Sequence, residues 1–158
     1  METRELTYLG NRAILKAPKT AFFCSRQCPA DIVVKSYDWA LEQRQKANCV
    51  ISCFHSRIEK DVFQILLKGS QPIILVLARG MQKRWSAQIK TALAQNRILI
   101  ISPFDESVKW INAQRADIRN RLMLDMADKI SIAHARSGGS LEGLLSFYRD
   151  KEVMIGFE

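Results

Sequence analysis

Residues 49–78, CVISCFHSRIEKDVFQILLKGSQPIILVLA, decide the fold. The apolar run at 49–53 predicts a buried strand, and 72–78 predicts a second one that is apolar throughout, as a central parallel strand is. Between them, apolar side chains recur at helical spacing over 56–68, which predicts an amphipathic helix. A strand, a helix and a strand in this order make one βαβ unit, with parallel strands and a right-handed crossover.

The same alternation continues on both sides of this unit. Further strands are predicted at 20–24, 97–101, 129–133 and 153–157, and further helices at 29–46, 85–95, 112–126 and 140–149. This order predicts an α/β fold in three layers, with a mostly parallel sheet and helices on both faces. We expect a single domain over residues 1–158, with residues 1–19 as a lead-in packed on it.

Composition narrows the class of protein. With 47% hydrophobic residues in 158, the chain is long and apolar enough for one sizeable core. The net charge of +8 favours acidic partners such as nucleic acid, nucleotides or an anionic surface, and an ordinary basic surface is the alternative. The longest apolar run is far shorter than a membrane span of about 20 residues. Because the N-terminus lacks the apolar stretch of a signal peptide, we expect a cytoplasmic protein without membrane contact.

Candidate ligand-binding residues follow the predicted strands, because ligands of open parallel sheets bind beyond the carboxyl ends of the strands. Ser25 and Arg26 follow the first strand, and a hydroxyl beside a guanidinium suits an anion. Ser52 ends the second strand. Gly80 follows the third, just before Lys83, Arg84 and Trp85, a basic cluster with an aromatic that suits a nucleic-acid backbone and a stacked base. The alternatives are a solvated Arg26 and a Trp85 that packs its helix on the sheet.

The fifth strand leads into a glycine-containing turn, Ser137, Gly138, Gly139 and Ser140. Glycines let backbone N–H groups approach a ligand closely, and Ser140 is expected to cap the next helix, whose dipole favours negative charge. Arg119 and Arg121 lie on the helix before this strand. At spacing i and i+2 they face different sides, so we expect only one of them to enter the site.

Cysteine and histidine residues give no catalytic set. The chain has four cysteines, of which Cys24, Cys28 and Cys53 would meet His55 at one sheet edge. Their spacing matches no standard zinc pattern, so ordinary thiols are expected rather than a metal site. Neither histidine has a nucleophile beside it in sequence. We therefore predict no catalytic residues, no metal and no cofactor.

The ordered motifs resemble the DNA-processing (recombination mediator) protein A family, also called Smf. Residues 8–11 and 21–26 resemble its opening segment and its Gly-Ser-Arg turn, with Cys24 at the glycine position. Residues 100–104 resemble its Ile-Ser-Glu-Phe/Tyr segment, 119–122 its Arg-Asn-Arg signature, and 137–141 its Ser-Gly-Ser-Leu turn with one extra glycine. The family is one branch of the Rossmann-like nucleotide-binding domains, which include the lysine decarboxylase-like phosphoribohydrolases.

This resemblance implies a bacterial, Rossmann-like domain that binds single-stranded DNA without catalysis and acts in recombination together with RecA. It implies that Ser25, Arg26, Arg119 and Arg121 hold DNA phosphates, and that the protein forms a homodimer. A first alternative is a sensor of a nucleotide or nucleotide derivative in the same pocket. A second is a phosphoribohydrolase acting on nucleoside monophosphates, although Glu142 lies three positions from where that branch carries its catalytic glutamate.

Overall fold

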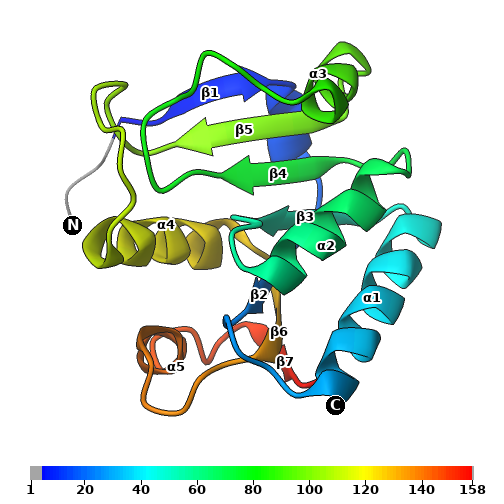
Figure 1. Ribbon diagram of the computed structural model, residues 1–158, viewed down its shortest axis with the longest axis vertical. Helices are drawn as coiled ribbons and strands as arrows, with labels where there is room; N and C mark the ends of the chain where they lie inside the picture. The colour runs from blue at the N-terminus through cyan, green and yellow to red at the C-terminus, as the bar shows by residue number, and fades with distance from the viewer. Residues whose placement is uncertain (1–4, 158) are drawn as a thin grey trace.

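The computed structural model describes residues 5–157 and contains one seven-stranded sheet. The strands are β1 (Thr7–Gly10), β2 (Lys19–Cys24), β3 (Cys49–Ser52), β4 (Ile73–Val76), β5 (Ile98–Ser102), β6 (Lys129–His134) and β7 (Glu152–Ile155). Their order across the sheet is β1-β5-β4-β3-β2-β6-β7. All neighbouring pairs are parallel except β1 with β5, so the arrow of β1 in Figure 1 points against those of β4 and β5.

Helices cover both faces of this sheet. They are the 3-10 helix η1 (Arg12–Lys16) and the α-helices α1 (Ala30–Gln45), α2 (Arg57–Leu67), α3 (Ala87–Ala94), α4 (Ala113–Met126) and α5 (Ser140–Leu145). One core cluster joins side chains of α1, α2 and α3 to one sheet face, and a second joins η1, α4 and α5 to the other. The expected three-layer α/β fold, with a mostly parallel sheet, is therefore confirmed.

Helix α2 shows how the sequence sets these elements. Its N-cap Ser56 accepts a hydrogen bond from the backbone N–H of Glu59, and the Glu59 side chain accepts one from the N–H of Ser56. This capping box fixes where the helix begins. Ile58, Val62 and Leu66 then lie on one buried stripe against the sheet.

Strand order places the switch point of the sheet between β2 and β6. The chain runs from β2 through β3 and β4 to β5 in one direction, and α4 then carries it back to β6, on the other side of β2. Phe22 and Phe23 on β2 are buried core residues. At such a switch point the loops on either side diverge and leave room for a ligand.

Strand β1 was not expected within the predicted lead-in. It pairs with the edge of β5 from Thr7↔Ser102 to Gly10↔Leu99. Gly10 has φ +105°, and a Cβ there would lie 2.3 Å from the Ile98 carbonyl oxygen. A glycine is needed where the chain leaves β1 for η1.

Candidate functional site

The carboxyl edge of the sheet brings the predicted site residues together. At the switch point the loops after β2 and β6 are joined by a hydrogen bond from the Ser25 N–H to the His134 carbonyl oxygen, 2.8 Å long. Arg26, next in the chain, is exposed and makes no hydrogen bond or ion pair with any described residue. The Ser25 hydroxyl donates to the Gln27 carbonyl oxygen at 3.4 Å. This turn therefore presents a guanidinium to solvent.

Ser52 and Gly80 lie at the same edge but are engaged inside the protein. The buried Ser52 hydroxyl donates to the Phe22 carbonyl oxygen at 2.9 Å and accepts from the Phe54 N–H at 3.2 Å. Gly80 is buried, and a Cβ there would lie 2.2 Å from the Asp105 carbonyl oxygen. Both residues hold loops in place, and their predicted contact with a ligand stays a prediction.

Arg119 and Arg121 point in different directions, as expected from their spacing. Arg119 is 6% exposed, and among residues 5–157 the only acceptor of its side chain is Oδ1 of Asn120, at 3.3 Å from Nε and 3.2 Å from Nη2. Arg121 is exposed and forms an ion pair with Asp117 at 3.1 Å, one turn earlier on α4. Arg119 is thus the buried cation of the pair, without a carboxylate partner among the described residues.

The charge of Arg119 acts on the end of β3. Burial lowers the pKa of His55, and the positive charges of Arg119 and Arg26 lower it further. Burial raises the pKa of the Cys53 thiol to about 12, whereas Arg119 acts in the opposite direction. The guanidinium therefore faces the loop between β3 and α2, beside the switch point.

The turn from Ser137 to Ser140 is open to solvent on the other side of the switch point. Gly138 has φ +73°, and a Cβ there would meet no atom within 4 Å. The N-cap of α5 is Gly139, and no side chain caps it, so the expected capping by Ser140 is wrong by one residue. Helix α5 also ends at Leu145, short of the predicted residue 149, because a 3-10-like turn closes it.

A basic pocket over the ends of β4 and β5 was only partly foreseen. Its volume is about 320 Å³, and its lining is Arg79, Met81, Gln82, Lys83, Arg84 and Lys109. The lining holds four cations and no carboxylate. The Nε of Arg79 is buried without a hydrogen-bond partner among the described residues. Lys83 and Arg84 were visible in sequence, but Arg79 and Lys109 come together only in the fold.

The two tryptophans near this pocket have different surroundings. Trp85 is half-buried and packs against the core cluster that also contains α3 side chains. This contact supports the alternative that Trp85 has a structural role. Trp110, directly after Lys109, is 80% exposed. An exposed indole beside a cationic pocket offers a surface on which a base can stack.

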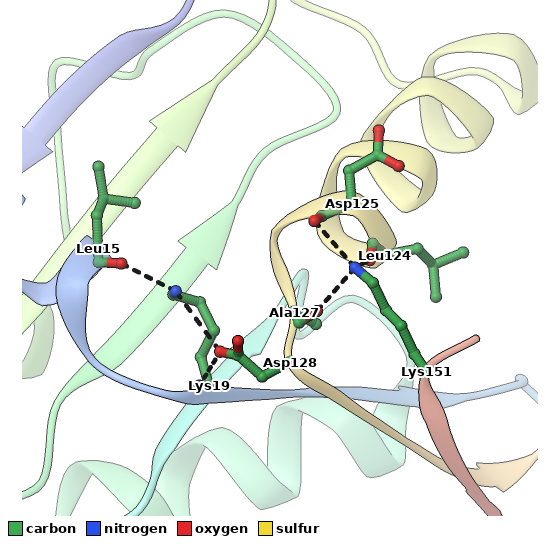
Figure 2. Close-up of polar contacts among 7 residues, drawn as sticks. All are labelled: Leu15, Lys19, Leu124, Asp125, Ala127, Asp128 and Lys151. Carbon is green, nitrogen blue, oxygen red and sulfur yellow. Dashed lines mark hydrogen bonds and ion pairs between the residues drawn. The ribbon is translucent and has the colours of Figure 1, made fainter. Parts of the chain in front are cut away.

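The opposite, amino edge of the sheet uses its cations inside the protein (Figure 2). Lys151 Nζ donates to the carbonyl oxygens of Leu124, Asp125 and Ala127, where α4 ends. Lys19 Nζ donates to the Leu15 carbonyl oxygen at 2.9 Å and lies 3.9 Å from an Asp128 carboxylate oxygen. The three N–H donors of Lys151 all have acceptors inside the protein, and the Lys19 side chain is buried against its own. Both ammonium groups are therefore directed inward.

Arg97 plays the same role at the end of α2. Its guanidinium donates to the carbonyl oxygens of Leu66 at 2.8 Å, Leu67 at 2.8 Å and Gln71 at 3.1 Å. Burial lowers its pKa. Leu66 and Leu67 are the last residues of α2, where carbonyl oxygens lack a partner within the helix, and Gln71 lies in the following loop, so the cation is structural.

The thiols are not arranged as metal ligands. Within residues 5–157, no group of three or more His, Cys, Asp or Glu side chains is placed to hold a metal ion. The four cysteines are free, and burial raises the pKa of Cys24 and that of Cys49. Cys24, Cys49 and Cys53, whose pKa values are raised by burial, are therefore protonated packing residues at neutral pH.

The fold and the carboxyl edge of the sheet together define the class of protein. It is a Rossmann-like α/β domain whose cations at the switch-point edge form no ion pairs with the described residues. Within that class, the chain belongs to the DNA recombination-mediator protein A family, whose model matches residues 2–154. The resemblance seen in the sequence is thereby confirmed. The comparison with curated proteins gives no match.

Solved structures agree with this assignment. DNA processing protein A from Helicobacter pylori, described with its single-stranded DNA binding mode, is similar with a TM-score of 0.76 at 18% identity over 95% of this chain and 70% of that one. DNA processing protein A from Streptococcus pneumoniae is similar with a TM-score of 0.75 at 19% identity, over 95% of this chain and 54% of that one. A molybdenum cofactor binding protein from Rippkaea orientalis is similar with a TM-score of 0.59 at 13% identity, over 89% of this chain and 76% of that one.

These identities show a shared fold and nothing finer. The chain spans about half the length of the pneumococcal structure. No helix among the described residues is long and apolar enough to cross a bilayer.

Proposed function

We propose that this chain binds single-stranded DNA through the cationic side chains at the carboxyl edge of its sheet, as a recombination-mediator domain. The observation that carries the proposal is the set of cations at this edge that have no anionic partner among the described residues. They are Arg26, Arg79, Lys83, Arg84, Lys109, Arg119 and Arg136. Family membership and the DNA-binding relative support the same reading.

The extent of this cationic surface favours a phosphodiester chain over a single small anion. The cations extend from the end of β6, across β2 and β3, to the pocket beyond β4 and β5. Neighbouring strands are about 4.8 Å apart, so β4 and β6 are separated by three spacings, roughly 14 Å. One phosphate cannot contact both ends of this surface, whereas successive phosphates of one strand can.

The buried guanidinium of Arg119 adds an energetic argument. A cation removed from water is unfavourable unless it is paired or strongly hydrogen-bonded. In the part of the chain that the structure describes, its only acceptor is the side chain of the adjacent Asn120. A DNA phosphate near the switch point would supply the missing charge in a charge-assisted hydrogen bond.

Fluorescence anisotropy with labelled single-stranded DNA of increasing length tests this function. We expect affinity to rise with length and to fall steeply with salt, because each phosphate contact releases counterions. Nucleoside monophosphates are expected to compete weakly. Absence of DNA binding at low salt, or complete competition by one mononucleotide, would instead support the alternative of a nucleotide sensor.

We also propose a cytoplasmic homodimer. Its support is two exposed apolar side chains, Phe147 after the end of α5, 74% exposed, and Ile155 on β7, 56% exposed. Strand β7 is an edge of the sheet, and its free side is open to pairing. Light scattering of the wild type and of Phe147→Ser tests the dimer: we expect twice the chain mass for the first and one chain mass for the second.

A further inference from the structure

At the switch-point edge, a carboxylate already occupies the position at a helix N-terminus where backbone N–H groups could bind a phosphate. Glu59 is 4% exposed and lies where β2 and β3 end and α2 begins. Its Oε2 accepts from the Cys24 N–H at 3.1 Å, and its Oε1 accepts from the N–H groups of His55 at 3.0 Å and Ser56 at 2.9 Å. The Cys53 thiol donates to Oε1 at 3.4 Å.

Only one of these contacts belongs to an ordinary capping box. The bond from the Ser56 N–H ties the carboxylate to its own helix N-terminus. The bonds from Cys24 and His55 come from the end of β2 and from the loop before α2. Backbone N–H groups of two loops converging at a helix N-terminus are what nucleotide-binding α/β sheets offer to a phosphate.

Other backbone donors at this edge are also used within the protein. The N–H of Ser25 donates to His134, that of Leu77 to Ile101 and that of Gly80 to Val108. The N–H of Phe54 donates to the hydroxyl of Ser52. The backbone N–H groups at these strand ends therefore already have acceptors inside the protein. The exposed cationic side chains are the groups at this edge that can bind an external anion.

We propose that Glu59 is a resident anion that makes this edge selective for a phosphodiester chain over free nucleotides and inorganic phosphate. The inference rests on the proposed DNA-binding function and names the residue that sets its selectivity. A mononucleotide has one phosphate group, so its affinity depends mainly on backbone N–H groups that surround that phosphate. Here those N–H groups already bind the buried carboxylate of Glu59. A DNA strand does not depend on these N–H groups, because its successive phosphates contact many cationic side chains along its length.

The test compares thermal unfolding in inorganic phosphate with unfolding in chloride at equal ionic strength, for the wild type and for Glu59→Ala. Phosphate stabilises folded proteins in general because it is excluded from their surface, so the wild-type rise in melting temperature from chloride to phosphate is the baseline. We expect a larger rise for Glu59→Ala, because an anion that binds only the folded state adds to its stability. Deoxyadenosine monophosphate is expected to raise the melting temperature of the variant and leave the wild type unchanged.

Glu142→Ala is the matched control. It also removes a carboxylate from the first turn of a helix, but Glu142 is exposed and makes no hydrogen bond with the described residues. We expect the rise of this control in phosphate to equal that of the wild type. If Glu59→Ala does not fold in chloride, Glu59→Gln, which keeps the volume and one acceptor oxygen, carries the same comparison, and phosphate in the refolding buffer is expected to rescue both variants.

A rise in the wild type as large as that of the Glu59 variants would overturn the proposal, and so would failure of phosphate to rescue variants that do not fold in chloride. None of these measurements contains DNA. Failure of the wild type to bind single-stranded DNA would remove the proposed function, whereas failure of the phosphate test would remove only the role of Glu59.

Discussion

The two edges of the sheet use the same residue types in opposite ways. At the amino edge, Lys19, Arg97 and Lys151 are directed at backbone carbonyl oxygens inside the protein. At the carboxyl edge, Arg26, Lys83 and Lys109 make no hydrogen bond or ion pair with the described residues. Net charge alone does not distinguish a structural cation from a binding cation; the surrounding backbone does.

Helix direction explains the difference. In a parallel α/β sheet, helices end at the amino edge, where their last carbonyl oxygens carry partial negative charge and attract cations. Helices begin at the carboxyl edge, where the dipole is positive and additional cations repel it. Cations kept at that edge therefore weaken the folded state slightly unless an anion binds there, and this is the physical signature of an anion site.

The largest expected effect is on stability at the amino edge. Arg97→Ala removes a buried guanidinium and its hydrogen bonds to the Leu66, Leu67 and Gln71 carbonyl oxygens, so we expect a loss of about 3 kcal/mol in the free energy of unfolding. Urea denaturation measures it, with Lys90→Ala on the exposed side of α3 as a control that stays within about 0.5 kcal/mol. DNA affinity at a temperature where the variant is folded should match the wild type.

The second effect is on binding at the carboxyl edge. Arg119→Ala should weaken single-stranded DNA binding by about tenfold to thirtyfold, because a charge-assisted bond from a buried guanidinium is lost. Its neighbour Arg121, paired with Asp117 on the exposed side of α4, provides the matched control. Equal losses in Arg119→Ala and Arg121→Ala, measured by anisotropy, would contradict the assignment of Arg119 to the site.

A third, smaller effect separates stability from binding. Lys151→Ala removes the ammonium that caps the end of α4 (Figure 2), and we expect a loss of about 1 to 2 kcal/mol in unfolding free energy. Because α4 carries Arg119 near its middle, far from this cap, DNA affinity should change less than about twofold. A large loss of affinity without loss of stability would show that the amino edge takes part in binding.

The smallest effect concerns the basic pocket. Lys83→Ala should lower affinity only a few-fold, and should reduce the slope of log affinity against log salt by about 0.7, the value for one phosphate contact on a single strand. Titrations at four or more salt concentrations give the slope. An unchanged slope would place Lys83 outside the DNA path.

Local pattern predicts much of the fold. Continuous apolar runs such as 73–76 and 98–101 form the central strands β4 and β5, which are buried on both faces. The short strand β1 gives no such signal, because two of its four residues are exposed and it is held by pairing with β5. Its existence depends on an edge that only the complete sheet supplies.

The site is less predictable because it depends on what each group already contacts. Sequence placed Ser52 and Gly80 at the correct edge, but their internal packing follows from loops far away in the chain. It did not single out Arg79 or Lys109, which reach one pocket from different loops. Glu59 looked like an ordinary helix residue, since its bond to Cys24 spans 35 positions.

The central claim is that position at the carboxyl edge, and not total charge, makes this chain bind DNA. The most direct test compares two double variants that each remove two lysines: Lys83→Ala/Lys109→Ala in the basic pocket, and Lys16→Ala/Lys68→Ala, both exposed, at the ends of η1 and α2 on the amino side. Anisotropy with one labelled single strand at low salt should show about a tenfold or greater loss for the pocket pair and less than about a twofold loss for the amino-side pair. Equal losses in the two variants would mean that net charge alone attracts the DNA, and would contradict the account.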